Sequence, residues 1–381
     1  MSLEDGVLVL EGGTGTPTFR GKLFGAPLGE YRADRGYGEL VFNTSMTGYQ
    51  EILTDPSYFG EIVCMTTAHL GNTGVNQDDP ESAKVWCAGF VVNDLTDSPS
   101  SWRSSGTLDS YLKEAGVPGL TGVDTRALTQ CLRSQGVKRA LILKASELSR
   151  ATELFSTLPQ FEGRDLIREV TTREAYTWPT SSVGQFRVSV LDFGLKWNLL
   201  RSLERRGCEV RVFPATASAE ELLASGPQGI FLSNGPGDPA AAGYAVDTVR
   251  ALVGKLPIFG VCMGHQILGL AMGAKTYKLK FGHRGGNQPV LNAATQRVEI
   301  SSHNHGYAVD EKTLPRGVRS THQNLNDHTC EGLEVEGKSA FSVQYHPEAC
   351  PGPHDSEALF DHFVGLMAAF QGEQVVCTKS T

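Results

Sequence analysis

The chain has 381 residues, 40% of them hydrophobic, which is enough for two or three globular domains with sizeable cores. Its formal net charge of -8 and its scattered Lys and Arg residues argue against general nucleic-acid binding. No apolar run approaches the roughly 20 residues of a membrane-spanning helix, and the first residues lack the basic start and apolar stretch of a signal peptide. The eight cysteines show no CxxC pairing, so we interpret them as reduced thiols of a cytoplasmic protein.

The first part of the chain combines short alternating strands with two amphipathic helices. Glycine-rich turns separate the first three strands, and Asp124 or Thr125 caps the second helix. Residues 47–58 are polar, rich in turn formers and contain aromatics, so composition favours an ordinary surface loop there. The predicted elements are strands over 6–11, 16–24, 38–43, 85–92 and 141–143, and helices over 107–114 and 125–135.

Residues 171–186 lose periodicity and are rich in Ser, Thr, Pro and Gly, which predicts a linker between domains over 1–170 and 187–375. Beyond it strands and helices alternate, and a capping box of Ser218 with Glu221 begins one helix. We therefore expect an α/β fold, with an N-terminal mixed β/α domain followed by a three-layer α/β domain around a parallel sheet. Its predicted elements are strands over 188–192, 209–213, 229–233, 256–261, 275–280, 297–301, 306–309, 332–335 and 340–344, and helices over 195–206, 240–253 and 355–370.

The apolar run over 256–261 leads into Gly260-Val261-Cys262-Met263-Gly264, and a helical pattern follows. Strand, sharp turn and helix form the arrangement of a nucleophile elbow, here with Cys in the place of Ser. The flanking glycines allow a tight turn and keep Cβ atoms away from the nucleophile. Cys262 would lie at a helix N-terminus, where free N–H groups and the helix dipole favour a thiolate. The alternative is a buried structural cysteine, because cysteine is often buried.

A catalytic thiolate needs an imidazole nearby and a third group that orients the imidazole. His346 ends an apolar strand, and because residues two apart in an extended chain point the same way, His346 and Glu348 share a face. A capping histidine with a surface glutamate, or a metal-binding pair, would give the same pattern. The glycine loop 234–237 also follows a strand, so both it and the elbow could donate N–H groups to one oxyanion at the carboxyl edge of the sheet.

Two glycine-rich stretches resemble nucleotide-binding loops, and their context rejects both. Residues 332–339 have the Walker A spacing, but two glutamates would repel phosphate and a strand follows where a helix is needed. We predict a hairpin turn at 337–338 instead. Residues 235–240 match the relaxed dinucleotide fingerprint, but Asp238 would face the pyrophosphate, and no acidic residue at a convincing second strand end follows within ~20 residues.

His303 and His305 form a His-x-His pair that is a rival candidate for metal binding. No carboxylate lies near them in the sequence, and a His-x-His pair on a strand is weak evidence alone. We therefore predict no metal site and no cofactor in this chain.

Three motifs of the second domain resemble those of class I (triad) glutamine amidotransferases. They are Gly-Val-Cys-Met-Gly-His-Gln at 260–266, Ser-Asn-Gly-Pro-Gly-Asp-Pro at 233–239 and His-Pro-Glu at 346–348. Further stretches resemble the small, glutamine-hydrolysing subunit of carbamoyl-phosphate synthase, so that the resemblance runs from about residue 5 to 370. These stretches are 42–58, 122–126, 280–287 and 304–306.

The resemblance implies a role for each matching residue. Cys262 would be the nucleophile, His346 the base and Glu348 its orienting group, and the N–H groups of Gly235 and Met263 would form the oxyanion hole. Ser57 belongs to the first domain, which implies that the two domains share the site. The residues that the resemblance assigns to glutamine are Ser57, Gly235, Gly237, Met263, Gln266, Asn304, Gly306 and Tyr307.

The resemblance also implies a reaction and a partner. The chain would hydrolyse L-glutamine through a thioester and pass ammonia to a large subunit, which would hold ATP and Mg and make carbamoyl phosphate from bicarbonate. The two chains would form a cytoplasmic heterodimer that serves arginine and pyrimidine biosynthesis. One rival hypothesis is an amidotransferase that feeds another synthase, against which the N-terminal motifs argue. Another is a non-catalytic module, against which the intact Cys262, His346 and Glu348 argue.

Overall fold

The structure is a computed structural model, of which residues 3–12, 17–180 and 184–379 are described. The chain divides into two compact units, Met1–Glu162 and Gly163–Thr381. Each unit has its own sheet and its own buried apolar clusters, and we describe the two separately.

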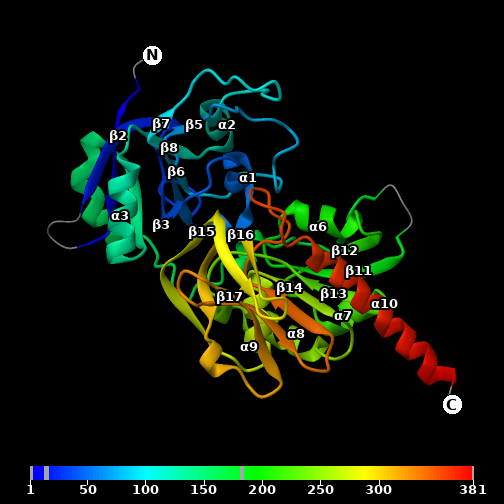
Figure 1. Ribbon diagram of the computed structural model, residues 1–381. Coiled ribbons are helices and arrows are strands. Elements are labelled where there is room, and N and C mark those ends of the chain that lie inside the picture. The colour runs from blue at the N-terminus through cyan, green and yellow to red at the C-terminus, as the bar shows by residue number, and fades with distance from the viewer. Residues whose placement is uncertain (1–2, 13–16, 181–183, 380–381) are drawn as a thin grey trace. The chain divides into compact units, whose positions relative to one another are not determined.

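The first unit is built around a closed β-barrel (Figure 1). Its strands follow the order β1-β2-β8-β6-β4-β3-β9. Antiparallel pairs, such as β1 with β2, occur beside parallel pairs, such as β3 with β4, so the sheet is mixed as predicted. The barrel strands are β1 (Asp5–Leu10), β2 (Thr18–Gly25), β3 (Tyr37–Asn43), β4 (Glu61–Met65), β6 (Gly89–Val91), β8 (Pro118–Thr121) and β9 (Lys138–Lys144).

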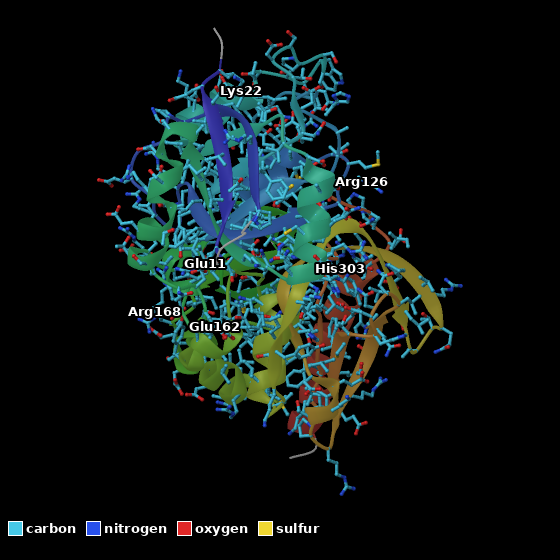
Figure 2. The ribbon with its side chains drawn as sticks, turned by 90° about the vertical axis from the view of Figure 1, so that its left-hand side faces the viewer. Glu11, Lys22, Arg126, Glu162, Arg168 and His303 are labelled. Carbon is cyan, nitrogen blue, oxygen red and sulfur yellow. The ribbon has the colours of Figure 1, made fainter. Side chains whose placement is uncertain are left out.

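Strand β4 of the barrel buries both of its faces. Along β4, Val63 belongs to one apolar cluster with residues of α1 and α2, whereas its neighbours Ile62 and Cys64 belong to another with residues of α3. This alternation follows from the two-residue period of a strand. Beside β1 and β9, Glu11 forms an ion pair with the buried Arg139 (Glu11 is labelled in Figure 2). The remaining elements are α1 (Tyr49–Thr54), η1 (Pro56–Tyr58), β5 (His69–Leu70), β7 (Asp94–Leu95), α2 (Leu108–Ala115), α3 (Thr125–Gln135), η2 (Ala145–Arg150) and α4 (Ala151–Thr157).

The prediction of a surface loop over 47–58 is wrong. Helix α1 and the 3-10 turn η1 occupy most of this stretch, and Tyr49, Ile52 and Leu53 are buried in the apolar cluster beside β4. These three residues have the spacing that places side chains on one helical face. The many polar and turn-forming residues around them concealed that spacing.

The second unit is centred on a sheet whose described strands number ten, in the order β10-β12-β11-β13-β14-β19-β18-β17-β15-β16 (Figure 1). From β12 to β19 neighbouring strands are parallel, whereas from β19 to β16 they are antiparallel. The predicted α/β class with a parallel sheet is confirmed, and the sheet extends further into antiparallel strands. Its strands are β10 (Tyr176–Thr177), β11 (Phe186–Asp192), β12 (Cys208–Pro214), β13 (Gly229–Leu232), β14 (Ile258–Val261), β15 (Thr276–Asn292), β16 (Arg297–Val309), β17 (Val318–Asn324), β18 (Cys330–Val335) and β19 (Ala340–Val343).

Helices cover both faces of the parallel half of this sheet. Ile230 and Leu232 of β13 belong to the apolar cluster that contains α7, α8 and α9, whereas Phe231 between them belongs to the cluster that contains α6 and α10. These are the three layers expected from the sequence. The helices and turns are α5 (Ile167–Val170), α6 (Trp197–Glu204), α7 (Ala219–Ala224), η3 (Pro239–Ala241), α8 (Gly243–Leu252), α9 (Met263–Ala271), η4 (Glu311–Thr313) and α10 (Ala358–Lys379).

Three further features bear on the sequence predictions. The hairpin turn at 337–338 is confirmed, because β18 and β19 are antiparallel on either side of it. The boundary between the two compact units, at 162/163, lies before the predicted linker 171–186. Strand β10, within the predicted linker, pairs with β12 of the second unit. In the described ranges no helix is both long and apolar enough to cross a membrane.

Candidate active site

Cys262 lies at the turn between β14 and α9, with 2% of its surface exposed. Its backbone has φ 53° and ψ -101°, a conformation that costs a non-glycine residue about 1–3 kcal/mol. A Cβ atom at Gly260 would lie 2.8 Å from the Gly264 carbonyl carbon, and one at Gly264 would lie 2.3 Å from the Leu232 oxygen. Only glycine fits on either side of the cysteine, so the Gly-x-Cys-x-Gly spacing forms the predicted sharp elbow.

His346 and Glu348 follow β19, which pairs in parallel with β14. His346 Nδ1 lies 2.7 Å from Glu348 Oε1, and both side chains are buried. The main chain fixes the histidine, because its N–H donates to the Ser302 carbonyl at 2.8 Å. The predicted proximity of these two side chains is thus present in the fold, and the structure adds that their strand neighbours the cysteine strand.

The electrostatics of this pair favour an imidazolium next to a carboxylate. Burial alone would lower the pKa of His346, but the charges of Glu348 and Cys262 raise it well above its ordinary value. Burial alone would raise the pKa of Glu348, but Lys196 and His346 hold it well below its ordinary value. Cys262 is thus close enough to influence the histidine electrostatically.

Lys196 was missed by the sequence reasoning. Its Nζ lies 3.0 Å from Glu348 Oε1 and also donates to the Ala349 carbonyl, and only 3% of its side chain is exposed. Asn198 Nδ2 donates to the Glu348 main-chain carbonyl. Both residues belong to the segment that begins α6, far from the motif in sequence, so only the parallel sheet brings them to Glu348.

Gly235 and Met263 follow the neighbouring strands β13 and β14. The Gly264 N–H donates to the Ser233 carbonyl at 2.9 Å, which joins the two loops directly. A Cβ atom at Gly235 would lie 2.1 Å from the Phe193 oxygen, so that position requires glycine. Gly237 has φ +84°, which also favours glycine. The two predicted oxyanion residues therefore lie close to adjoining segments, Gly235 in the loop after β13 and Met263 at the start of α9. Their role stays a prediction.

Asn304, Gly306 and Tyr307 lie in β16, beside the elbow. The Cys262 thiol lies 3.5 Å from the Asn304 carbonyl oxygen. Gln266, on α9, donates from Nε2 to the Tyr307 carbonyl at 2.8 Å. The start of α9, with Cys262 and Gln266, thus lies beside β16, which is distant in the sequence.

Ser57 lies in η1 of the first unit and is buried there. Its N–H donates to the Asp55 side chain, which caps the turn, with 2.9 Å between Ser57 N and Asp55 Oδ1. Its predicted contact with glutamine stays a prediction.

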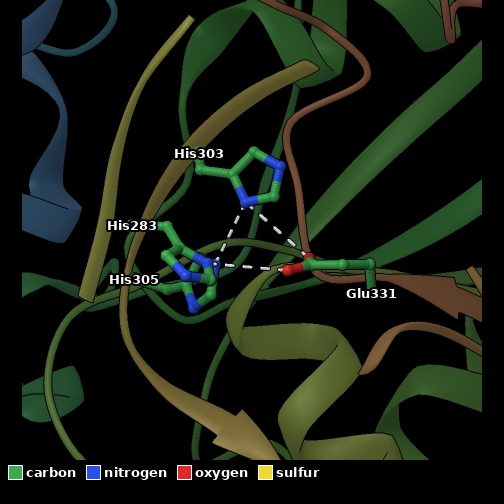
Figure 3. A group of neighbouring side chains, drawn as sticks. All are labelled: His283, His303, His305 and Glu331. Atoms are coloured by element: carbon green, nitrogen blue, oxygen red, sulfur yellow. Dashed lines mark hydrogen bonds and ion pairs between the residues drawn. The ribbon is translucent and has the colours of Figure 1, made fainter. Parts of the chain in front are cut away.

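A second group of polar side chains lies in the antiparallel half of the same sheet (Figure 3). His303, labelled in Figure 2, and His305 come from β16. His283 comes from β15 and Glu331 from β18. The sequence reasoning found no carboxylate near the His-x-His pair, but the fold supplies one from β18. We name this group the histidine–glutamate cluster, and its members are His283, His303, His305 and Glu331.

Comparison with known proteins first defines the class of the second unit. The family described as Glutamine amidotransferase class-I matches residues 189–366. A solved structure described as a glutamine amidotransferase from Thermotoga maritima covers 43% of this chain and 76% of its own, with 17% identity and a TM-score of 0.35.

The particular family follows from the whole chain. The family described as Carbamoyl-phosphate synthase small chain, CPSase domain, matches residues 8–142. The carbamoyl phosphate synthase small chain of Syntrophotalea carbinolica is 50% identical over 362 residues, which cover 92% of this chain and 95% of that protein. The chloroplastic small chain of Oryza sativa is 46% identical over 378 residues, covering 96% and 82%. The chain therefore belongs to the family of carbamoyl phosphate synthase small chains, glutamine-hydrolysing enzymes with a class-I glutamine amidotransferase domain.

Proposed function

We propose that this chain hydrolyses L-glutamine at Cys262 and delivers the ammonia to a carbamoyl phosphate synthase large subunit. The observation that carries the proposal is the 2.7 Å contact between His346 and Glu348, which follow β19, the neighbour of the strand that leads into the strained cysteine elbow. A nucleophile, a base and an orienting carboxylate are the three parts that acyl transfer from an amide needs.

In the proposed reaction the Cys262 thiolate attacks the glutamine carboxamide carbon. The oxyanion that forms is held by the N–H groups of Gly235 and Met263, and one such donor is worth roughly 3–4 kcal/mol. His346 gives its proton to the leaving ammonia, which leaves a γ-glutamyl thioester on the sulfur. His346 then takes a proton from water as the water attacks the thioester, and glutamate and the free thiol are released.

The remaining parts of the proposal concern the partner. ATP, Mg and bicarbonate would be used by the large subunit, in a cytoplasmic heterodimer that supplies carbamoyl phosphate for arginine and pyrimidine biosynthesis. The whole-length similarity to small chains supports this assignment over an amidotransferase that serves another synthase.

Mass spectrometry after treatment with a glutamine-mimicking alkylator tests the proposal, with the adduct expected on Cys262. In the assembled enzyme, Cys262→Ser is expected to abolish glutamine-dependent synthesis and to spare ammonia-dependent synthesis. An adduct on another cysteine, with Cys262 unmodified, would sink the assignment.

A further inference from the structure

The histidine–glutamate cluster has no part in the proposed reaction, yet it is almost completely buried (Figure 3). Glu331 is fully inaccessible, and no member of the cluster is more than 6% exposed. Burial of so many polar rings and a carboxylate is costly unless they are paired or bind a metal ion.

The inward-facing atoms of the cluster are spaced like the ligands of one ion. All four candidate ligand atoms lie within 4.8 Å of one another. His303 Nδ1 lies 3.2 Å from His305 Nε2 and 3.7 Å from Glu331 Oε2. His283 Nδ1 lies 3.6 Å from Glu331 Oε1. Around a tetrahedral zinc ion with bonds of about 2.0–2.2 Å, neighbouring ligand atoms are about 3.4 Å apart.

Each imidazole uses its other nitrogen for a hydrogen bond away from the centre of the cluster. Such outer contacts fix the tautomer and orientation of a metal-binding histidine, and they usually come from carboxylates, carbonyls or other polar groups. The three rings are therefore already aimed inward. The outer contacts, each 2.8 Å long, join His283 Nε2 to Asp327 Oδ2, His303 Nε2 to Ser301 Oγ, and His305 Nδ1 to the Tyr307 carbonyl.

The inner side of the cluster has buried polar atoms that no hydrogen bond satisfies. Within the described residues, His283 Nδ1 and Glu331 Oε2 are buried without a hydrogen-bond partner.

We propose that the histidine–glutamate cluster is a structural binding site for one zinc ion. Imidazole nitrogens and a carboxylate oxygen are ligands that Zn²⁺ uses, and four protein ligands satisfy its tetrahedral preference. Because the four ligands are buried and leave no open position, the ion has a structural role.

The zinc ion would hold the part of β16 that borders Cys262. His303 and His305 flank Asn304, whose carbonyl oxygen contacts the cysteine thiol at 3.5 Å. His305 also shares the Tyr307 carbonyl with Gln266, at 2.8 Å each. This consequence rests on the proposed function, since it assigns the cluster a positioning role in glutamine binding.

The test measures zinc in the full-length chain by elemental mass spectrometry after reconstitution with zinc chloride and dialysis. We expect about one ion per chain in the wild type, and a loss of at least about tenfold in Glu331→Gln and His303→Gln. Cobalt substitution should give the visible absorption bands of a tetrahedral site in the wild type alone. His322→Gln is the matched control, because His322 is a buried histidine on β17 outside the cluster, and it should keep the zinc.

Circular dichroism identifies which variants are folded, and either folded variant suffices for the comparison. A reconstituted wild type without zinc, or folded variants that retain it, would overturn the proposal. Removal of zinc by a chelator should raise the KM for glutamine several-fold with a smaller change in kcat, and zinc should restore it. Zinc counts do not depend on catalysis, so a zinc-binding chain without glutaminase activity would refute the proposed function and not the metal site.

Discussion

Glu348 in the candidate triad and Glu331 in the histidine–glutamate cluster are both fully buried carboxylates beside imidazole rings. Glu348 also accepts from the buried Lys196 at 3.0 Å. Among the described residues, no lysine or arginine forms an ion pair with Glu331, whose partners are histidines, Thr329 and an asparagine. The two sites therefore differ in whether the protein supplies a permanent positive charge.

This difference has opposite effects on the ionisable groups. In the candidate triad the pKa of the Glu348 carboxyl falls and that of His346 rises, which favours the charged form of both groups. In the cluster, burial raises the pKa of Glu331 and lowers those of His303 and His305. A buried carboxylate with its own lysine suits acid–base chemistry, whereas one that no lysine or arginine neutralises suits an added cation.

The largest expected effect comes from removing the triad carboxylate. The Glu348 carboxylate orients the His346 ring and raises the pKa of His346, and Glu348→Gln removes both effects. In comparable triads this kind of change lowers kcat by about 10³- to 10⁴-fold. Steady-state glutaminase assays measure the effect. Glu334→Gln, at a half-exposed glutamate on β18, is the matched control and should leave kcat nearly unchanged. A loss below tenfold for Glu348→Gln would show that the carboxylate is not part of the catalytic group.

The second-largest effect is expected on stability, when the permanent positive charge of Lys196 is removed. Lys196→Met leaves Glu348 buried without its lysine, and breaking a buried ion pair from one side costs about 3–5 kcal/mol of stability. Urea unfolding at pH 7 measures the loss, with tryptophan fluorescence as the probe, since Trp197 is the next residue. Lys312→Met, at an exposed lysine, should change stability little.

The pH dependence of the same variant has a definite sign. The folded-state pKa of Glu348 lies below its unfolded value of 4.5, so its contribution to stability is present above pH 4.5 and is lost as the pH falls toward 2. Without Lys196 the folded-state pKa rises toward the unfolded value, and this contribution shrinks. The difference in stability between wild type and Lys196→Met should therefore narrow between pH 4.5 and 2. A difference that stays constant over this range would contradict the assigned ion pair.

The triad was predictable because each of its parts occurs in a short motif. Glycines stand on both sides of Cys262 where a Cβ atom would clash, and His346 and Glu348 lie two residues apart after a strand. Lys196 was not predictable in this way, because its contact with Glu348 depends on which strands are neighbours in the sheet. An isolated antiparallel bridge also brings Ser302 of β16 to the His346 N–H, at 2.8 Å, and no sequence pattern indicates it.

The cluster was missed for a related reason. The sequence reasoning predicted separate short strands where β15 and β16 are long and continuous. Register shifts along β15 and the positive φ of Gly282 interrupt the regular alternation that identifies a strand. His283 reaches the His-x-His pair through the antiparallel pairing of β15 with β16, and Glu331 comes from β18, so spacing along the chain could not reveal these two members.

A smaller effect is expected at Ser57, which lies in the first unit and whose role comes from the resemblance alone. If its hydroxyl bonds glutamine, Ser57→Ala should remove about 0.5–1.5 kcal/mol of binding, which raises the KM for glutamine roughly 2- to 13-fold. The reactivity of Cys262 toward the alkylator should persist. An unchanged KM combined with weaker assembly with a large subunit would assign Ser57 to subunit contact instead.

The smallest effect is expected at Lys338, an exposed lysine, in contrast to the buried Lys196. Lys338 carries the position of a Walker A lysine in the sequence, but it is exposed in the turn between β18 and β19, and its N–H donates to the Val335 carbonyl. Lys338→Ala removes an exposed charge away from the packed interior, so stability should change by no more than about 0.5 kcal/mol. Glutaminase kcat should also be unchanged, and isothermal titration with ATP should give the same result for both chains. If the wild-type chain bound ATP and Lys338→Ala did not, the turn would be a phosphate site. The exposed Lys338 would then have a binding role of its own, as the buried Lys196 has a role in holding Glu348.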